Sequence, residues 1–233
     1  MQSNAPAMLL IVRLHKDGRA SIVLESCIVR KTVALKMMKK DSPERVPEEY
    51  YTTDEYLSFE RQSVDAKHEY LDGEIVAMAG ASRAHNLITG NIAQRLRNQL
   101  GGTTCETYTS DMRVKTSPTR YTYPDVVVVC QTPELEDEHL DTLLNPTVIV
   151  EVLSPSTTAR DRNQKFSEYR ALPSVRDYLV VSQDRMLVEH YSRQPNNDWT
   201  LHEVVSPDEA IPITSIGCEL SLSDVYERVE FPS

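Results

Sequence analysis

The sequence predicts an α/β fold with a mixed β-sheet, on the basis of three observations. Residues 126–129 and 148–153 form two short apolar runs rich in Val and Ile, a pattern typical of strands that are covered on both faces. Residues 82–102 carry an amphipathic pattern that predicts a helix lying against a sheet. Because helical and strand patterns alternate within one stretch of chain, we expect them to build one α/β domain.

The first predicted elements are a short helix and a β-hairpin. Residues 52–55 read Thr-Thr-Asp-Glu, a capping box that satisfies the free amides at a helix start. Residues 68–71 and 74–78 flank Asp72-Gly73, a pair suited to the positive φ angles of a two-residue hairpin turn. We therefore expect ordered structure to begin near residue 52.

The long helix that follows has clear limits. Ser82 can cap its start, and Gly101-Gly102 stops it. Between them one apolar stripe repeats every four residues, through Ala84, Ile88, Ile92, Leu96 and Leu100. Beyond this helix, strands are predicted near residues 105–115, 123–130, 147–153, 178–181, 187–191 and 199–205, and helices near 159–172 and 222–229.

The first 45 or so residues differ from the rest of the chain. They are rich in Lys and Arg and weakly patterned, and Met37-Met38 could serve as a chain start. We expect residues 1–45 to be an extension, either disordered or an upstream misassigned start, and residues 46–233 to form a single domain. Residues 21–24 could still form a strand.

Composition limits the compartment and the cysteine chemistry. The longest apolar runs are far shorter than the roughly 20 residues needed to cross a bilayer, so we expect a cytoplasmic protein without a membrane partner. The cysteines are widely spaced without a C-x-x-C pair, and we interpret them as reduced core residues in preference to zinc ligands or disulfides. These four are Cys27, Cys105, Cys130 and Cys218.

The charge pattern bears on nucleic-acid binding in two ways. The formal net charge of −10 argues against it, because a duplex repels an acidic surface. Residues 83–120 are nevertheless locally basic and could position a nucleic-acid backbone, or they could simply be a solvated face. The basic residues there are Arg83, Arg95, Arg97, Arg113, Lys115 and Arg120.

Several nucleotide-dependent and hydrolytic classes are excluded by their missing motifs. The chain has only seven glycines, and it contains neither G-x-x-x-x-G-K-[ST] nor G-x-G-x-x-G. It also lacks H-E-x-x-H and G-x-S-x-G.

Two carboxylates interrupt the apolar strands and are the strongest candidates for chemistry. Asp125 opens the run 126–129, and Glu151 lies inside the run 148–153. An unpaired buried carboxylate costs several kcal/mol, so such a group usually meets a partner, a proton or a metal. Asp125 could instead bond local amides at a loop end. We interpret the pair as ligands of Mg²⁺, which prefers one or two carboxylates, waters and phosphate oxygens; Mn²⁺ can substitute.

Lys165 is the candidate cation beside this pair. It follows Asp161 by four residues, so an ordinary helical ion pair is one interpretation. The other is that its ammonium lies near the metal and stabilises charge on a phosphoryl oxygen.

Three further residues are auxiliary candidates. Glu74 and Asp111 could add carboxylates, Glu74 to the catalytic set and Asp111 to the metal ligands, although each position also suits a surface residue. His85 lies in the first turn of its helix, where the helix dipole favours a neutral ring that could accept a proton. Backbone bonding or packing would also explain this histidine.

The order of short motifs resembles the Uma-type family of restriction-endonuclease-like proteins, a branch of the PD-(D/E)-x-K superfamily. The resemblance runs from about residue 53 to residue 229. It rests on Asp72-Gly73-Glu74, Ala84-His85-Asn86, Ser110-Asp111-Met112, Tyr123-Pro124-Asp125, Glu151 to Ser156, and Asp161 to Lys165-Phe166.

This resemblance implies a restriction-endonuclease-like mixed sheet flanked by helices, with Asp125 and Glu151 as metal ligands in Mg²⁺-dependent cleavage of DNA. Leu153 stands where the superfamily has its lysine, and the resemblance implies that Lys165 takes that role. A catalytically degenerate module of the same fold, binding nucleic acid or protein, is the alternative. Cutting both strands with one site per chain would favour a homodimer.

Overall fold

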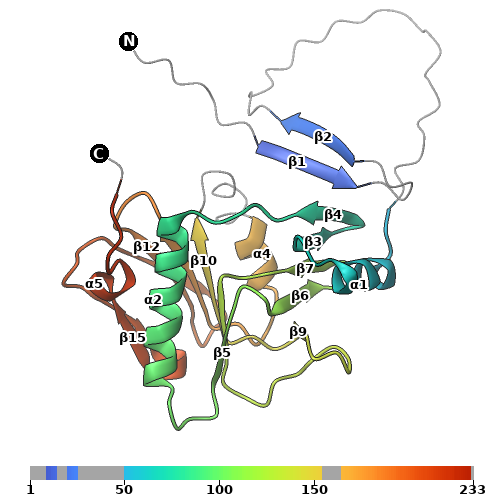
Figure 1. The fold of residues 1–233 in the computed structure, drawn as a ribbon. Coiled ribbons are helices and arrows are strands. Elements are labelled where there is room, and N and C mark those ends of the chain that lie inside the picture. Colours follow the sequence, from blue (N-terminus) through green and yellow to red (C-terminus); the bar gives the residue numbers. More distant parts are fainter. Residues whose placement is uncertain (1–8, 15–19, 26–49, 154–163, 232–233) are drawn as a thin grey trace, which may run out of the picture. The chain divides into compact units, whose positions relative to one another are not determined.

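The computed structural model describes residues 9–14, 20–25, 50–153 and 164–231 (Figure 1). The chain divides into two compact units, residues 1–78 and 79–233. This division differs from the predicted boundary near residue 45, because the N-terminal strands, the first helix and the first hairpin group together.

The first unit contains a sheet built from two hairpins. Strand β1 (Leu9–Leu14) pairs antiparallel with β2 (Ala20–Glu25), and Arg13 of β1 is also paired with Val76. The described part of the N-terminal segment is thus a hairpin, and residues 21–24 adopt the strand that the sequence left open.

The predicted helix and second hairpin of this unit are both confirmed. Helix α1 (Thr53–Gln62) begins with the expected capping box, in which Thr52 N donates to Glu55 Oε2 at 2.8 Å and Thr52 Oγ1 accepts from Glu55 N at 3.3 Å. Strands β3 (His68–Leu71) and β4 (Glu74–Ala77) meet at a turn with φ of 50° at Asp72 and 101° at Gly73.

The second unit is organised around a mixed six-stranded sheet in the order β13-β12-β11-β10-β8-β5. β10 and β11 run parallel, and every other neighbouring pair is antiparallel. The strands are β5 (Glu106–Thr109), β8 (Val126–Val129), β10 (Val148–Leu153), β11 (Asp177–Ser182), β12 (Val188–Arg193) and β13 (Trp199–Val204). As predicted, the two most apolar strands, β8 and β10, are central and fully buried.

Smaller elements complete this unit. They are β6 (Arg113–Ser117), β7 (Arg120–Thr122), β9 (Thr142–Leu143), β14 (Ala210–Ile213), η2 (Thr214–Ile216), β15 (Cys218–Ser221) and α5 (Leu222–Val225). The sequence did not predict β14 and β15. The single strand predicted near residues 105–115 was wrong: Ser110 has a φ of 38° and the chain turns there, so β5 and β6 join different sheets.

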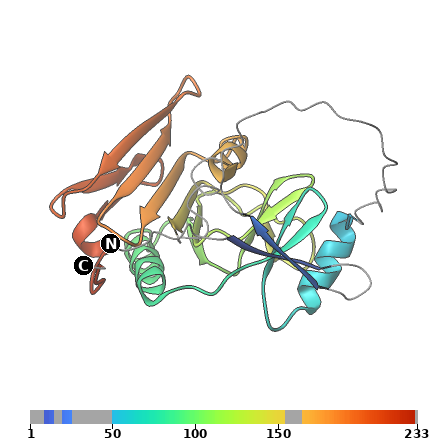
Figure 2. The ribbon, with the colours of Figure 1, turned by 90° about the horizontal axis from the view of Figure 1, so that it is seen from above.

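Two helices cover opposite faces of the sheet, as Figure 2 shows. Helix α2 (Arg83–Gln99) is capped by Ser82, as predicted, and its stripe of Ile88, Ile92 and Leu96 packs on one face. Helix α4 (Phe166–Tyr169) lies on the other face. The side chains of β10 alternate, so that Val150 packs toward α2 and Ile149 toward α4.

The later helices are shorter than predicted where they are described. Of the helix expected over 159–172, residues 154–163 lie outside the described residues, so Asp161 cannot be placed; α4 is the part that the structure describes. The final helix ends at Val225 and not at residue 229, and Arg228 has a φ of 61°, which a helix cannot contain.

The interpretation of all cysteines as reduced was wrong for two of them. Cys105 and Cys130 form a disulfide, whereas Cys218 is free and buried. The pairing follows from register, because Glu106 lies opposite Val129 and the next step places Cys105 opposite Cys130. Cys27 lies outside the described residues.

No helix among the described residues is long and apolar enough to cross a membrane.

Candidate active site

Glu151 is buried in the middle of the second unit's sheet. It lies on β10 with 3 % of its surface exposed. The alternation along β10 directs it to the face on which Ile149, Leu153 and α4 lie. A carboxylate at such a depth requires polar partners, and α4 provides them.

Lys165 and Tyr169 both donate to the same oxygen of Glu151. Lys165 Nζ lies 3.0 Å from Glu151 Oε1, and Tyr169 Oη lies 2.7 Å from it. Lys165 directly precedes α4 and is only 5 % exposed, so its ammonium forms a buried ion pair with the carboxylate. The structure thus brings Lys165 to Glu151 although 14 residues separate them.

Asp125 directly precedes the neighbouring strand β8 and lies across from Glu151. In the β8–β10 ladder Val126 is opposite Val150, and one further step places Asp125 opposite Glu151. Residues opposed in an antiparallel pair have Cβ atoms about 4.5–5.5 Å apart. Asp125 Oδ2 ends this ladder by accepting a hydrogen bond from Val152 N at 2.7 Å.

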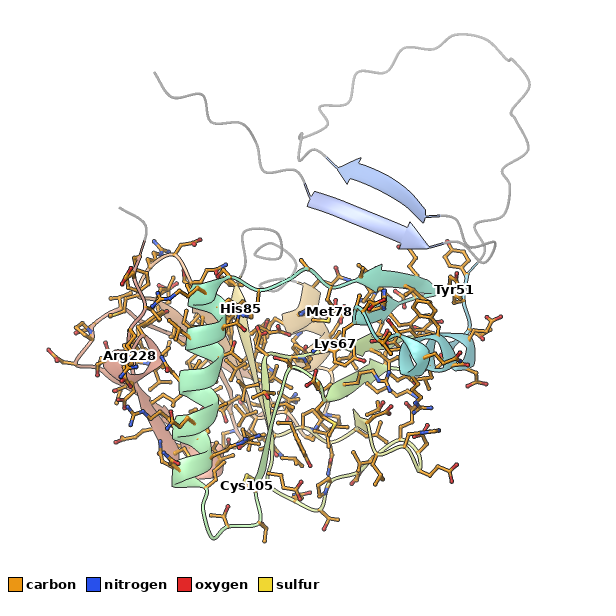
Figure 3. All side chains as sticks on the ribbon, in the orientation of Figure 1. Tyr51, Lys67, Met78, His85, Cys105 and Arg228 are labelled. Atoms are coloured by element: carbon orange, nitrogen blue, oxygen red, sulfur yellow. A yellow bond between two sulfur atoms is a disulfide. The ribbon has the colours of Figure 1, made fainter. Side chains whose placement is uncertain are left out.

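His85 approaches Asp125 from the helix on the opposite face. Its Nε2 lies 3.3 Å from Asp125 Oδ2, and both side chains are 14 % exposed. Ser82 positions this first turn of α2, because its Oγ accepts from His85 N at 3.1 Å. Figure 3 labels His85 near the start of α2. Asp125 therefore stands between a histidine from α2 and a glutamate held by α4.

The remaining two candidates, Glu74 and Asp111, lie on other elements. Glu74 begins β4 in the first unit and is half-buried there. Asp111 is exposed in the turn after β5, beside Ser110, whose N donates to Asp125 O at 3.2 Å. In the described part of the chain no three His, Cys, Asp or Glu side chains gather as a metal site. The assignment of Asp111 as a metal ligand stays a prediction.

The basic segment 83–120 does not present a free positive surface. Five of its six cationic side chains contact partners within the second unit, and those partners are mostly acidic. The contacts are Arg95 with Asp224 and Glu227, Arg97 with the carbonyl of Thr107, Arg113 with Asp141, Lys115 with Glu136, and Arg120 with Glu168. Arg83, the sixth, is exposed in the first turn of α2.

A family model matches residues 53–223, which is most of the chain and includes all six candidate residues. The chain belongs to the Uma2 family. That model is described as "Putative restriction endonuclease". The resemblance read from the motif order is thereby confirmed at the level of the family.

Two curated relatives come from Synechocystis and have names without a function. "Uncharacterized protein sll1609" is 38% identical over 161 residues, covering 69% of this chain and 90% of that protein. "Uncharacterized protein slr1290" is 35% identical over 179 residues, covering 76% of this chain and 92% of that protein.

A solved structure supports the fold. The crystal structure of "a putative nuclease belonging to DUF820" from Anabaena variabilis matches with a TM-score of 0.64 and 17% identity, covering 77% of this chain and 99% of that one. The α/β class predicted for this Uma2 chain, with a restriction-endonuclease-like mixed sheet, is confirmed.

Sequence reasoning missed two polar residues of this Uma2 site. Tyr169 is fully buried, and its hydroxyl lies 3.0 Å from Thr122 Oγ1 as well as bonding Glu151. Gln183 is 6 % exposed just after β11, and its Oε1 accepts from Ser82 Oγ, which ties this strand end to the start of α2. Tyr169 follows Lys165 by four residues, a spacing that could have revealed it on the same helix face.

The Tyr169 hydroxyl makes a pH-dependent contribution to stability. Burial raises the pKa of Tyr169 well above its usual value of about 10, the Glu151 carboxylate raises it further, and Lys165 partly opposes both. The unfolded chain therefore loses this proton near pH 10 while the folded chain keeps it. The stabilising contribution is present below about pH 10 and is lost as the pH rises further.

We expect Tyr169→Phe to reduce the alkaline loss of stability. Between pH 8 and pH 11 the wild type should lose more free energy of unfolding than the variant, at most about 1.4 kcal/mol per pH unit above pH 10. Urea unfolding at each pH measures this, with Tyr50→Phe, a tyrosine 56 % exposed, as the control. Equal slopes for all three proteins would contradict the assignment.

Proposed function

We propose that this Uma2 protein is a Mg²⁺-dependent nuclease that hydrolyses phosphodiester bonds in DNA. The observation that carries the proposal is the opposition of Asp125 and Glu151 across β8 and β10, with Lys165 bonded to Glu151 at 3.0 Å. Carboxylates and an ammonium at one strand end are the groups that phosphoryl transfer to water requires.

The donor set fits a magnesium ion. Mg²⁺ takes one or two carboxylates and fills its other positions with waters and phosphate oxygens, so Asp125 and Glu151 suffice without a third protein ligand. Asp125 Oδ1 has no hydrogen-bond partner among the described residues and can serve as a ligand while Oδ2 holds Val152 N. When bound, the cation would neutralise phosphate charge and acidify a coordinated water.

The chain's own groups would divide the remaining work. The Lys165 ammonium stabilises the negative charge that develops on the phosphoryl oxygens as water attacks phosphorus and the P–O bond to the sugar breaks. Tyr169 and Lys165 together fix Glu151 Oε1, so the carboxylate keeps one orientation. The His85 ring contacts Asp125 Oδ2 at 3.3 Å, which supports a role for His85 in orienting this carboxylate and accepting a proton.

Two exposed arginines at the same sheet edge can contact the nucleic-acid backbone. Arg83 adjoins Ser82, and Arg185 lies two residues beyond Gln183, so they flank the contact between those two side chains. Both are exposed and neither forms an ion pair among the described residues, whereas the other five cations of the 83–120 segment are bonded to acidic or carbonyl groups. We propose that they position the phosphates, and that two copies of the chain act together when both strands are cut.

The decisive experiment is a calorimetric Mg²⁺ or Mn²⁺ titration of the wild type, with the same sample incubated with supercoiled plasmid. We expect metal binding and metal-dependent nicking, both unchanged in Asp198→Asn, which removes an exposed carboxylate from the turn between β12 and β13. If the wild type neither binds the metal nor nicks the plasmid, the nuclease proposal is contradicted. That result would favour the catalytically degenerate module, which the replacement of the superfamily lysine by Leu153 and the pairing of the cations in the 83–120 segment also support.

A further inference from the structure

A second polar site lies at the other end of the two parallel strands. A cavity of about 260 Å³ is lined by Gln131, Thr147, Ser174, Arg176 and Ser215, together with neighbouring residues. Thr147 directly precedes β10 and Arg176 directly precedes β11, so the cavity borders the amino ends of both strands. The candidate active site lies toward their carboxyl ends.

This cavity is separate from the candidate active site. Glu151 lies four residue steps beyond Thr147 along extended chain, a distance of about 13 Å. Cys130, which also lines the cavity, is bonded to Cys105, and Figure 3 labels Cys105 and His85 near opposite ends of α2. A ligand in the cavity would therefore not touch Glu151.

The charge around the cavity favours an anion. The exposed guanidinium of Arg176 has no ion-pair partner among the described residues. The guanidinium of the neighbouring Arg193 donates hydrogen bonds to the carbonyls of Val175 and Leu172. Burial lowers the pKa of Arg193, and the charge of Arg176 lowers it further, so the two cations repel each other. An anion beside Arg176 would relieve this repulsion.

The nearest buried acid is already engaged. Asp177 accepts hydrogen bonds from His190 Nε2 at 2.7 Å and from the Ser215 hydroxyl, so its two oxygens are each bonded to a donor. Thr147 Oγ1 likewise accepts from Cys130 N at 3.2 Å. These contacts fix the cavity wall without using Arg176.

Ser174 provides an unused donor in the same wall. Its Oγ is buried and has no hydrogen-bond partner among the described residues. A buried hydroxyl without a partner costs about 1–3 kcal/mol. Ser174 lines the cavity, and rotation about its Cα–Cβ bond would turn the hydroxyl toward a ligand oxygen there.

We propose that this cavity binds a phosphate-type oxyanion, held by the Arg176 guanidinium and the Ser174 hydroxyl. The planar guanidinium matches two oxygens of a tetrahedral oxyanion, and the Ser174 hydroxyl reaches a third. The volume suits a free phosphate or a small phosphorylated molecule; a terminal phosphate of a nucleic acid presents the same chemistry. This proposal goes beyond the nuclease function and does not depend on it.

A phosphate titration without divalent metal tests the site, because the candidate active site then lacks the cation that would attract phosphate. Inorganic phosphate is titrated into the wild type by calorimetry against chloride at matched ionic strength. We expect saturable binding that weakens about tenfold or more in Arg176→Gln and several-fold in Ser174→Ala. Arg228→Gln is the matched control, since that side chain is 82% exposed and lies near α5 (Figure 3).

Two outcomes would overturn the proposal: no phosphate-specific binding in the wild type, or equal affinity in the wild type and a folded Arg176→Gln. Competition by a 5′-phosphorylated dinucleotide then shows which kind of molecule carries the phosphate that the cavity binds. If it displaces phosphate and its unphosphorylated form does not, the site takes a nucleic-acid terminus; if neither does, it takes a free small phosphate. The titration measures phosphate binding and not cleavage, so its result is the same whether or not the protein is a nuclease.

Discussion

Glu151→Gln should abolish plasmid cleavage and also destabilise the fold. Cleavage is expected to fall by about 10³-fold or more, because an amide is a poor ligand for Mg²⁺ and no longer pairs with Lys165. The free energy of unfolding should fall by about 3–5 kcal/mol, since the buried Lys165 ammonium loses the carboxylate 3.0 Å away. Urea unfolding and a plasmid assay measure the two losses separately.

A double variant separates the catalytic loss from the structural one. Glu151→Gln combined with Lys165→Met removes both charges together, so much of the lost stability should return, whereas cleavage should stay absent. If Glu151→Gln alone is as stable as the wild type, the Glu151–Lys165 ion pair contributes little to the stability of the fold. Retained cleavage in either variant would remove Glu151 from the reaction.

Asp125→Asn should lose activity as strongly as Glu151→Gln but lose little stability. The side-chain oxygen of asparagine can still accept from Val152 N, so we expect a change in unfolding free energy below about 1 kcal/mol. Metal affinity and cleavage should fall together, cleavage by about 10³-fold, or roughly 4 kcal/mol of barrier.

Asp125→Ala provides the structural comparison. It removes the acceptor for Val152 N as well as the charge, so it should lose about 1–3 kcal/mol more stability than Asp125→Asn while being equally inactive. Calorimetric metal titration, thermal unfolding and plasmid cleavage check this together. Full metal affinity in Asp125→Asn would mean that this carboxylate is not a ligand.

Local chemistry made parts of the fold predictable. The capping box at Thr52, the Asp72-Gly73 turn and the stripe from Ile88 to Leu96 each act within a few residues, and the structure has all three. The burial of β8 and β10 was also predictable, because short runs rich in β-branched Val and Ile favour a strand covered on both faces. The strands β14 and β15 carry a weaker pattern and were not predicted.

The sequence identified candidate residues of the site but not how their side chains contact one another. A charge inside an apolar strand identifies Glu151 from the sequence, because burial without a partner is so costly. Its partners come from other elements, so only the packing of α4 on the sheet reveals that Lys165 and Tyr169 share one oxygen of Glu151. The same holds for the cations of the 83–120 segment, whose acidic partners are mostly distant in sequence.

The α/β class, the family and the choice of Asp125 and Glu151 as candidates could be predicted from the amino-acid sequence, because each rests on local pattern or on the spacing of motifs. Which groups meet depends on the packing of the folded chain. It paired Cys105 with Cys130 through strand register, brought Lys165 to Glu151, and placed His85 next to Asp125. Register and helix packing depend on contacts between distant residues, and no single stretch of sequence records them.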